Sequence, residues 1–244
     1  CITNQTIKPK EIFIWVNNNL LSYILNIETS TTICSVSLFK NSELVSFKQE
    51  NDQNYSHSKR LHVFINSILE DSKVSSKDLS AVSVSKGPGS YTGLRIGVSS
   101  AKGLCFALGI PLISVDTLDA FAHQIESPDG FIVPLIDARR MEVYSSVYDK
   151  KFTKIRETRA EILTKDSFQE YLKTNKVYFL GNANEKTKSI IDSPNAIFVE
   201  HKLPSSIEIG KLASLKFISN DFEDTANFEP FYLKEFIGNR LKSN

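Results

Sequence analysis

The stretch SKGPGSYTGLRIG, residues 85–97, combines residue types that could bind an anion. Gly87, Pro88 and Gly89 predict a tight turn at the end of a strand, and Ser90 or Thr92 can cap the helix that follows. A glycine-rich turn from a strand into a helix exposes backbone N–H groups at a positive helix end, which suits a phosphate. The stretch lacks the lysine of GxxxxGK[ST] and does not fit GxGxxG, so neither motif specifies phosphate binding.

The helix after this turn carries a second signal. Gly93, Gly97 and Ala101 recur every four residues and form a ridge of small side chains. Gly93, Gly97 and Gly103 together cost about 3 kcal/mol of helix stability relative to alanine, which unusually close packing along the ridge would offset. The neighbour is either part of this chain, its own sheet or its 57–71 helix, or a helix of another chain. The residues alone leave both alternatives open.

No familiar catalytic arrangement accompanies these features. HEXXH and GxSxG are absent, none of the four histidines pairs with a cysteine as base with nucleophile, and His57 and His62 lack i, i+4 spacing. Glu28 ends the first predicted strand, where an acidic residue could serve a metal-bound nucleotide, but it is a single carboxylate without partners. The sequence therefore predicts neither catalytic residues nor a metal site.

The composition is that of an ordinary soluble globular protein with one large domain or two small lobes. The 244 residues are 41% hydrophobic and 23% charged. The net charge is +1, from 29 basic and 28 acidic residues, so contact with RNA would have to be local or shared with a partner. Cys1, Cys34 and Cys105 lack CxxC spacing, which argues against a disulfide framework or zinc site and favours a reducing compartment. No apolar run is long enough to span a membrane.

Hydrophobic periodicity predicts the elements that position these residues. Residues 23–127 have the order βββαβαβα, which is typical of a mixed sheet flanked by helices. Residues 128–244 are interpreted as a degenerate second copy, including a C-terminal helix, and residues 1–22 as an N-terminal extension or artificial remnant. The charge-rich stretch 150–176 is interpreted as a solvated helix face. The predicted strands cover 23–27, 33–39, 44–50, 81–85, 111–115, 131–137, 142–149, 176–181 and 196–200, and the predicted helices 57–71, 92–108, 117–124, 165–174 and 205–219.

Several motifs occur in an order that resembles the bacterial TsaB family, also called YeaZ. They are NIETSTTICSVSL (26–38), HSKRLHVFI (57–65), SKGPGSYTGLRIGVSSAKGL (85–104), PLISVDTLDAFA (111–122), IDARRMEVY (136–144) and EPFYL (229–233). The resemblance implies an α/β fold with two actin-like lobes, of the ASKHA or ribonuclease H-like type, whose second lobe is shortened. It covers nearly all of the chain from Tyr23 onward.

The resemblance also implies a function. TsaB-like proteins are non-catalytic cytoplasmic subunits that bind and activate TsaD, with the small ATPase TsaE, for threonylcarbamoylation of the adenosine next to the tRNA anticodon. ATP is used by the complex, tRNA is reached only through it, and a homodimer is expected when the partner is missing. The two metal-binding histidines of TsaD correspond here to Thr117 and Phe121, which are not metal ligands.

The resemblance implies where a partner would bind. Helices matching 57–71 and 92–108 dock on TsaD in the family, which favours an interface on the small-residue ridge. The predicted partner-binding residues are His57, Leu61, Phe64, Ser90, Thr92, Gly93, Gly97 and Ala101.

An alternative function is an autonomous actin-fold ATPase or small-molecule kinase. It would use a cleft between the lobes. The candidate nucleotide-binding residues, which would be vestigial in a non-catalytic chain, are Glu28, Thr29, Ser30, Gly181 and Asn182. Glu28 replaces the aspartate common in the first phosphate loop of the family, which argues against independent ATP hydrolysis. Tyr91 departs from the usual phenylalanine.

Overall fold

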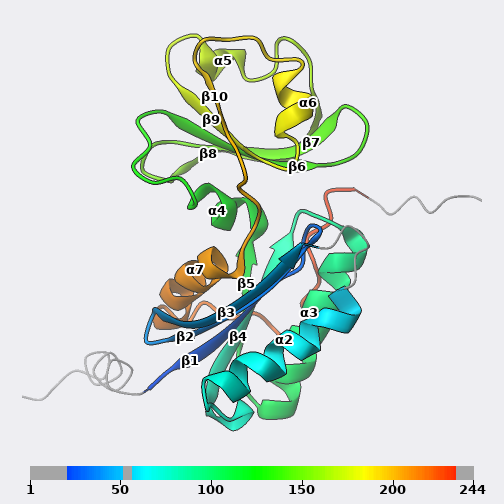
Figure 1. Cartoon of the computed structure of the whole chain (residues 1–244), viewed down its shortest axis with the longest axis vertical. Helices are drawn as coiled ribbons and strands as arrows, with labels where there is room; N and C mark the ends of the chain where they lie inside the picture. The colour runs from blue at the N-terminus through cyan, green and yellow to red at the C-terminus, as the bar shows by residue number, and fades with distance from the viewer. Residues whose placement is uncertain (1–20, 52–56, 235–244) are drawn as a thin grey trace, which may run out of the picture.

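The computed structural model describes residues 21–51 and 57–234. The chain forms two lobes, each built around a five-stranded mixed sheet, and the second lobe stands above the first in Figure 1. The two-lobed actin-like α/β architecture expected from the sequence is confirmed.

The first sheet has the strand order β3-β2-β1-β4-β5. Strands β1, β2 and β3 are antiparallel neighbours, whereas β4 and β5 join as parallel strands through helical crossovers. The strands are β1 (Tyr23–Glu28), β2 (Ile33–Lys40), β3 (Glu43–Asn51), β4 (Leu79–Gly87) and β5 (Leu112–Asp116). Helices α2 (His57–Asp71) and α3 (Tyr91–Leu108) lie side by side over one face, as both views show, and the short helix η1 (Ser76–Asp78) precedes β4.

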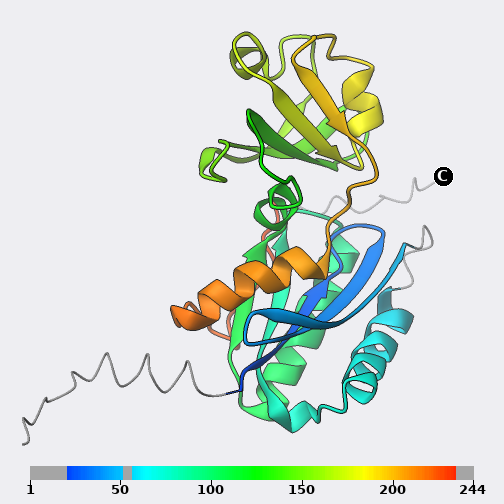
Figure 2. The ribbon, with the colours of Figure 1, turned by 60° about the vertical axis from the view of Figure 1, so that its left-hand side comes forward.

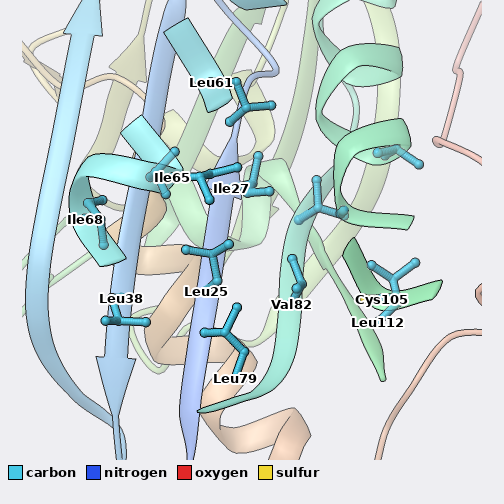
Figure 3. Packing of buried hydrophobic residues seen from close by; sticks show 14 of the residues in the cluster. Leu25, Ile27, Leu38, Leu61, Ile65, Ile68, Leu79, Val82, Cys105 and Leu112 are labelled. Atoms are coloured by element: carbon cyan, nitrogen blue, oxygen red, sulfur yellow. The ribbon is translucent and has the colours of Figure 1, made fainter. Parts of the chain in front are cut away.

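The main core lies between this sheet and the two helices. Leu61, Ile65 and Ile68 of α2 point onto β1 and β2, where Leu25 and Ile27 meet them (Figure 3). All five side chains are nearly or completely buried. Burial of this apolar surface is the main term that fixes α2 on the sheet.

Helix α7 (Ser206–Ile218) covers the opposite face of the same sheet. Ile209 and Ala213 of α7 pack against Ile24, Ala81 and Ile113, and Figure 2 shows the helix lying across the strands. The sequence predicts that the helix 205–219 belongs to the second lobe. The structure corrects this prediction, because the helix packs on the sheet of the first lobe. The apolar side of α7 belongs to the core of the first lobe, because together with Ala120 of α4 it covers this face of the sheet.

The second sheet repeats the topology of the first, with the order β8-β7-β6-β9-β10. Its helices are short, with four residues in α5 and five in α6 against 15 in α2 and 18 in α3. The second lobe is therefore a shortened copy, as the sequence indicates. Its elements are β6 (Phe131–Asp137), β7 (Glu142–Tyr148), β8 (Lys154–Ile162), α5 (Gln169–Leu172), β9 (Val177–Gly181), α6 (Asn184–Lys188) and β10 (Ala196–Val199).

The interpretation of the charge-rich stretch 150–176 as a solvated helix face is wrong. Residues Lys154–Ile162 form strand β8 at the edge of the second sheet, paired with β7. The predicted helix 165–174 is reduced to α5, and α6 has no counterpart among the predicted elements. Most of the predicted extension 1–22 lies outside the described residues.

Helix α4 (Thr117–Ala122) connects the lobes. Phe121 and Ala122 share a buried cluster with Ile132, Tyr148 and Leu180 of the second lobe. Apolar packing therefore continues from one lobe into the other through this helix.

Candidate functional site

The glycine-rich turn between β4 and α3 is filled by the chain's own backbone. Ser90 N–H donates to Ser30 O at 2.6 Å, and the Ser90 side chain accepts from Gly93 N–H at 3.3 Å, so it caps α3 as the sequence predicts. A Cβ atom at Gly89 would lie less than 3.0 Å from Ser30. The turn therefore closes onto the β1–β2 loop, and its glycine is needed for that close approach.

The ridge of small residues on α3 faces inward. Thr29 Oγ1 donates to Gly93 O at 2.8 Å. A Cβ atom at Gly93 or at Gly97 would lie less than 3.0 Å from Thr29, and Ala101 is completely buried. Of the two alternatives for the ridge, the structure shows packing against the protein's own sheet.

Glu28, at the end of β1, is completely buried beneath this contact. Ser30 N–H donates to its Oε1 at 2.5 Å. Burial raises the pKa of the Glu28 carboxyl, while hydrogen bonds from Ser30 and Ser85 partly oppose the rise. Burial therefore disfavours the charged form of this carboxyl and closes it off from solvent.

The five predicted nucleotide-binding residues fall into two groups, one in each lobe. Glu28, Thr29 and Ser30 are fully buried under α3. Asn182 is exposed on the second lobe, where its Oδ1 accepts from Asp137 N–H at 2.8 Å. Gly181 has a φ of +134° and packs on Leu135. Among the described residues, no hydrogen bond joins the two groups.

Most predicted partner-binding residues are also internal. Leu61 lies in the main core, and the buried His57 ring nitrogen Nε2 is 2.8 Å from Thr31 O. Gly93, Gly97 and Ala101 are buried as well. The prediction that these five residues bind a partner is therefore corrected, because the chain itself covers them. Phe64 and Ser90 are partly exposed and Thr92 is exposed, so these three stay predictions.

The same two helices nevertheless present an unusual outer surface. Phe106 on α3 is 87% exposed and Val63 on α2 is 56% exposed. Ser99 and Gly103 lie beside Phe106 on the outward side of α3 and are exposed. We call these four residues the α2–α3 face. Among the described residues Phe106 is the most exposed large hydrophobic side chain, and phenylalanine is enriched at protein–protein interfaces.

A polar contact joins the two helices that carry the α2–α3 face. His62 Nε2 and Ser100 Oγ lie 3.3 Å apart and join the two helices near their outer edges. The sequence analysis missed Val63 and Phe106 because it followed the small-residue ridge. Their signal is present in the sequence, since both are apolar residues outside the i, i+3, i+4 stripe that faces the core.

Among residues 21–51 and 57–234, no cluster of three or more His, Cys, Asp or Glu side chains could hold a metal ion. Thr117 and Phe121 are both fully buried in α4. In the same described residues, no helix combines the length and the apolar character that crossing a membrane requires.

Comparison with known proteins gives a consistent picture. The family model for TsaD, tRNA N6-adenosine threonylcarbamoyltransferase, matches residues 51–234. The chain is 28% identical over 229 residues to the tRNA threonylcarbamoyladenosine biosynthesis protein TsaB of Haemophilus influenzae, covering 88% of this chain and 94% of that protein. It is 39% identical over 132 residues to TsaB of Bacillus subtilis, a match that covers 52% of this chain and about half, 56%, of that protein.

A solved structure shows the same fold. It is a Pseudomonas aeruginosa protein described as similar to the peptidase YeaZ, with a TM-score of 0.78, 23% identity and coverage of 88% of this chain and 100% of that one. The family-model match spans most of the chain, and the TsaB relatives agree with the motifs found in the sequence. The chain belongs to the TsaB (YeaZ) family, within the wider TsaD-like group.

Proposed function

We propose that this chain is a non-catalytic subunit of tRNA threonylcarbamoyladenosine biosynthesis, which binds and activates a TsaD-like transferase through the α2–α3 face. The observation that carries the proposal is the 87% exposure of Phe106 on an ordered helix. A helix of the partner that packs over Phe106 and Val63 would remove both side chains from water, which is the usual driving force of such association.

The closed glycine loop supports the non-catalytic part of the proposal. Thr29 and Ser30 occupy the space beside Gly89, Gly93 and Gly97 that a phosphate would need. Glu28, the one acidic residue at the end of β1, is buried with a raised pKa. These contacts argue against the alternative of an autonomous ATPase or kinase, because nucleotide binding would first have to separate the loop from α3.

Membership of the TsaB family supports the rest of the proposed complex. A TsaE-like ATPase joins the two subunits, ATP is consumed by the assembly, and tRNA is reached through it in the cytoplasm. Without the partner, two copies of this chain pair through the same face. Gly103 suits either occupant, because nothing in the described chain lies within 4 Å of a Cβ atom added there and a second helix can approach closely.

Replacement of Phe106 by aspartate tests the proposal. The change places a charge at the centre of the face without entering the core, so we expect a melting temperature close to that of the unmodified chain and loss of co-elution with the TsaD-like subunit. Leu215→Asp is the matched control, because Leu215 is 64% exposed on α7, across the sheet from α2 and α3.

The reaction is then followed with the TsaD-like and TsaE-like subunits, the adenylate-forming enzyme, ATP, bicarbonate, threonine and unmodified tRNA. We expect threonylcarbamoylation to depend on this chain, to survive Leu215→Asp and to be lost with Phe106→Asp. Full modification of the tRNA without this chain would overturn the proposed role. A large thermal shift of the isolated chain with ATP and Mg²⁺ would favour the ATPase instead.

A further inference from the structure

Aromatic and cationic side chains meet where the last described residues pass the start of α3. The rings of Tyr91 and Tyr232 have centroids 4.9 Å apart. Arg95 stacks on Tyr91, with its guanidinium carbon 5.1 Å from the ring centroid, and donates from Nη1 to the Tyr91 hydroxyl at 3.1 Å. Tyr232 is 36% exposed and Arg95 is exposed, so both remain open to a ligand.

The segment that carries Tyr232 is tied down on both sides. Phe231 N–H donates to Lys86 O at 2.7 Å, and Lys102 Nζ donates to Phe228 O at 2.8 Å. Lys234 forms an ion pair with Glu142 at the start of β7. Figure 1 shows this segment running from the first lobe past α3 toward the second. Tyr232 is thus held beside α3, two residues before the contact that Lys234 makes with the second lobe.

The β6–β7 hairpin adds two arginines to the same region. Arg139 and Arg140 have φ values of +69° and +50°, a conformation that long side chains rarely adopt. Asp137 Oδ1 accepts from Arg139 N–H at 2.6 Å and holds this backbone in place. The ion pair between Lys234 and Glu142 brings the C-terminal segment against the end of this hairpin, two residues after Arg140. The backbone bonds of the turn, from Ala138 N–H to Glu142 O and from Glu142 N–H to Arg139 O, fix both arginines at the tip of the hairpin.

Lysines of this region form ion pairs, whereas its arginines form none among the described residues. Asp137 and Glu142 form ion pairs with Lys186 and Lys234, and Glu229 is a third nearby carboxylate that acts on Tyr232. Within the described chain, the arginines that form ion pairs are Arg60, Arg156 and Arg159. The three arginines on this surface, Arg95, Arg139 and Arg140, are not among them. A net positive, aromatic surface therefore spans the junction of the lobes.

We propose that this surface, formed by Tyr91, Arg95, Arg139, Arg140, Tyr232 and Lys234, contacts the RNA substrate directly in the assembled complex. The inference rests on the proposed function. Stacked aromatic rings and guanidinium planes bind unpaired bases, and arginines bind phosphates. The net charge of +1 is too small for the chain to hold RNA alone, so the contact adds to binding by the partner.

The chemistry favours an RNA strand over a free nucleotide. The cationic groups come from α3, the β6–β7 hairpin and the C-terminal segment, which is a spread suited to several phosphates in a row. The glycine loop that would enclose a single nucleotide phosphate is filled by Thr29 and Ser30.

The test measures binding of unmodified substrate tRNA to the complex of this chain and the TsaD-like subunit, over a series of salt concentrations. For Arg139→Ala/Arg140→Ala we expect about tenfold weaker binding and a salt dependence whose log–log slope is smaller by about 1 to 2. For Tyr232→Ala we expect about tenfold weaker binding with an unchanged slope, and for Tyr232→Phe nearly normal binding. Lys165→Ala/Lys173→Ala removes equal charge from two exposed positions around α5, beyond the second sheet, and is expected to change neither quantity.

The outcomes separate this inference from the proposed function. Normal co-elution of every variant with the TsaD-like subunit, together with unchanged RNA affinity and salt slope, would overturn the RNA contact and leave the proposed function standing. Failure of the unmodified chain to join the complex would overturn both. Competition by ATP alone, abolished by the same variants, would assign the surface to a free nucleotide and contradict the inference.

Discussion

At Thr29 the side chain hydroxyl bonds to the carbonyl of Gly93, and the next turn of α3 passes the same residue at Gly97. Two glycines four apart let the helix backbone approach the β1–β2 loop more closely than any other residue would permit. The cost of glycine in this helix is therefore offset inside the chain, without a partner. A bulky residue at Gly97 would disturb folding before it could report on partner binding.

Two alanine substitutions on the same helix should have opposite effects on stability. Gly97→Ala places a methyl group less than 3.0 Å from Thr29 Oγ1, so we expect a loss of about 1–3 kcal/mol in the free energy of unfolding. Gly103→Ala meets nothing within 4 Å, so we expect a gain of about 0.5–1 kcal/mol from the better helix propensity of alanine. Urea unfolding measures both. A gain from both changes would contradict the close packing of α3 on Thr29.

At the scale of the elements, the first lobe could be predicted closely because its strands and helices carry strong periodic signals. The predicted helix 57–71 coincides with α2, and the predicted helix 92–108 begins one residue after α3 does. What could not be predicted is which elements cover each face. Ser35 and Ser37 alternate with apolar residues on β2, as in a half-exposed strand, yet both are buried by α7, where they bond to Ser206.

Strand β8 escaped prediction for a related reason. Its residues Lys154–Ile162 are mostly charged on both faces, so no hydrophobic period of two is present. Arg156 on its inner side is held by Glu161 at 2.7 Å and stacks on Phe168. An ion pair and a cation–π contact pack the inner side of this strand, where apolar side chains are usual. Neither contact can be recognised from a sequence pattern.

The sequence predicts α2 and α3 as the elements of the proposed docking surface, but most of the residues that it names on them are buried. Periodicity identifies the apolar stripe of a helix, and on α2 and α3 that stripe faces the sheet. Leu61 and Ala101 follow the stripe and are buried, whereas Val63 and Phe106 interrupt it and are exposed. Which of two apolar faces is the inner one depends on tertiary packing, which the sequence does not display.

The packing of α7 leads to a prediction about one element. Ile209 is completely buried against the first sheet, so Ile209→Ala should lower the free energy of unfolding by about 2–5 kcal/mol through lost burial and the cavity left behind. Leu215→Ala, on the exposed side of the same helix, should change it by less than about 0.5 kcal/mol. Equal, small effects of the two changes in urea unfolding would contradict the assignment of α7 to the first lobe.

At the scale of the whole molecule, a small polar cluster joins the two lobes beside α4. Lys154 of β8 lies 2.8 Å from Asp119 and 3.4 Å from Asp116 of the first lobe. Tyr148 of β7 donates to Asp119 at 2.5 Å. Burial raises the pKa of Asp116, its neighbour Asp119 adds to the rise, and Lys154 opposes it. These contacts of Lys154 add a polar link between the lobes to the apolar packing around α4.

Removal of the lysine should uncouple the lobes. Lys154→Met leaves Asp116 buried without its nearest cation, and we expect a loss of about 2–3 kcal/mol, less than for a fully buried pair because Asp119 is partly exposed. Addition of Asp116→Asn should restore much of the loss, since asparagine can still cap α4 as Asp116 does. Unfolding by urea, with a double-mutant cycle, measures the coupling. Lys176→Met, which breaks an exposed ion pair with Asp129, is the control and should have little effect.

The pH dependence of stability distinguishes loss of the ion pair from loss of packing, because only loss of the ion pair changes the free energy of unfolding with pH. A carboxyl whose folded pKa lies above its unfolded pKa binds more protons in the folded state, so its contribution to stability is lost as the pH rises through the folded pKa. Without Lys154 the pKa of Asp116 rises further. The free energy of unfolding that Lys154→Met loses should therefore become larger as the pH is raised from 4 to 7. When Asp116→Asn is added, the loss should no longer depend on pH. A deficit that is the same at every pH would mean that Lys154 joins the lobes by packing alone.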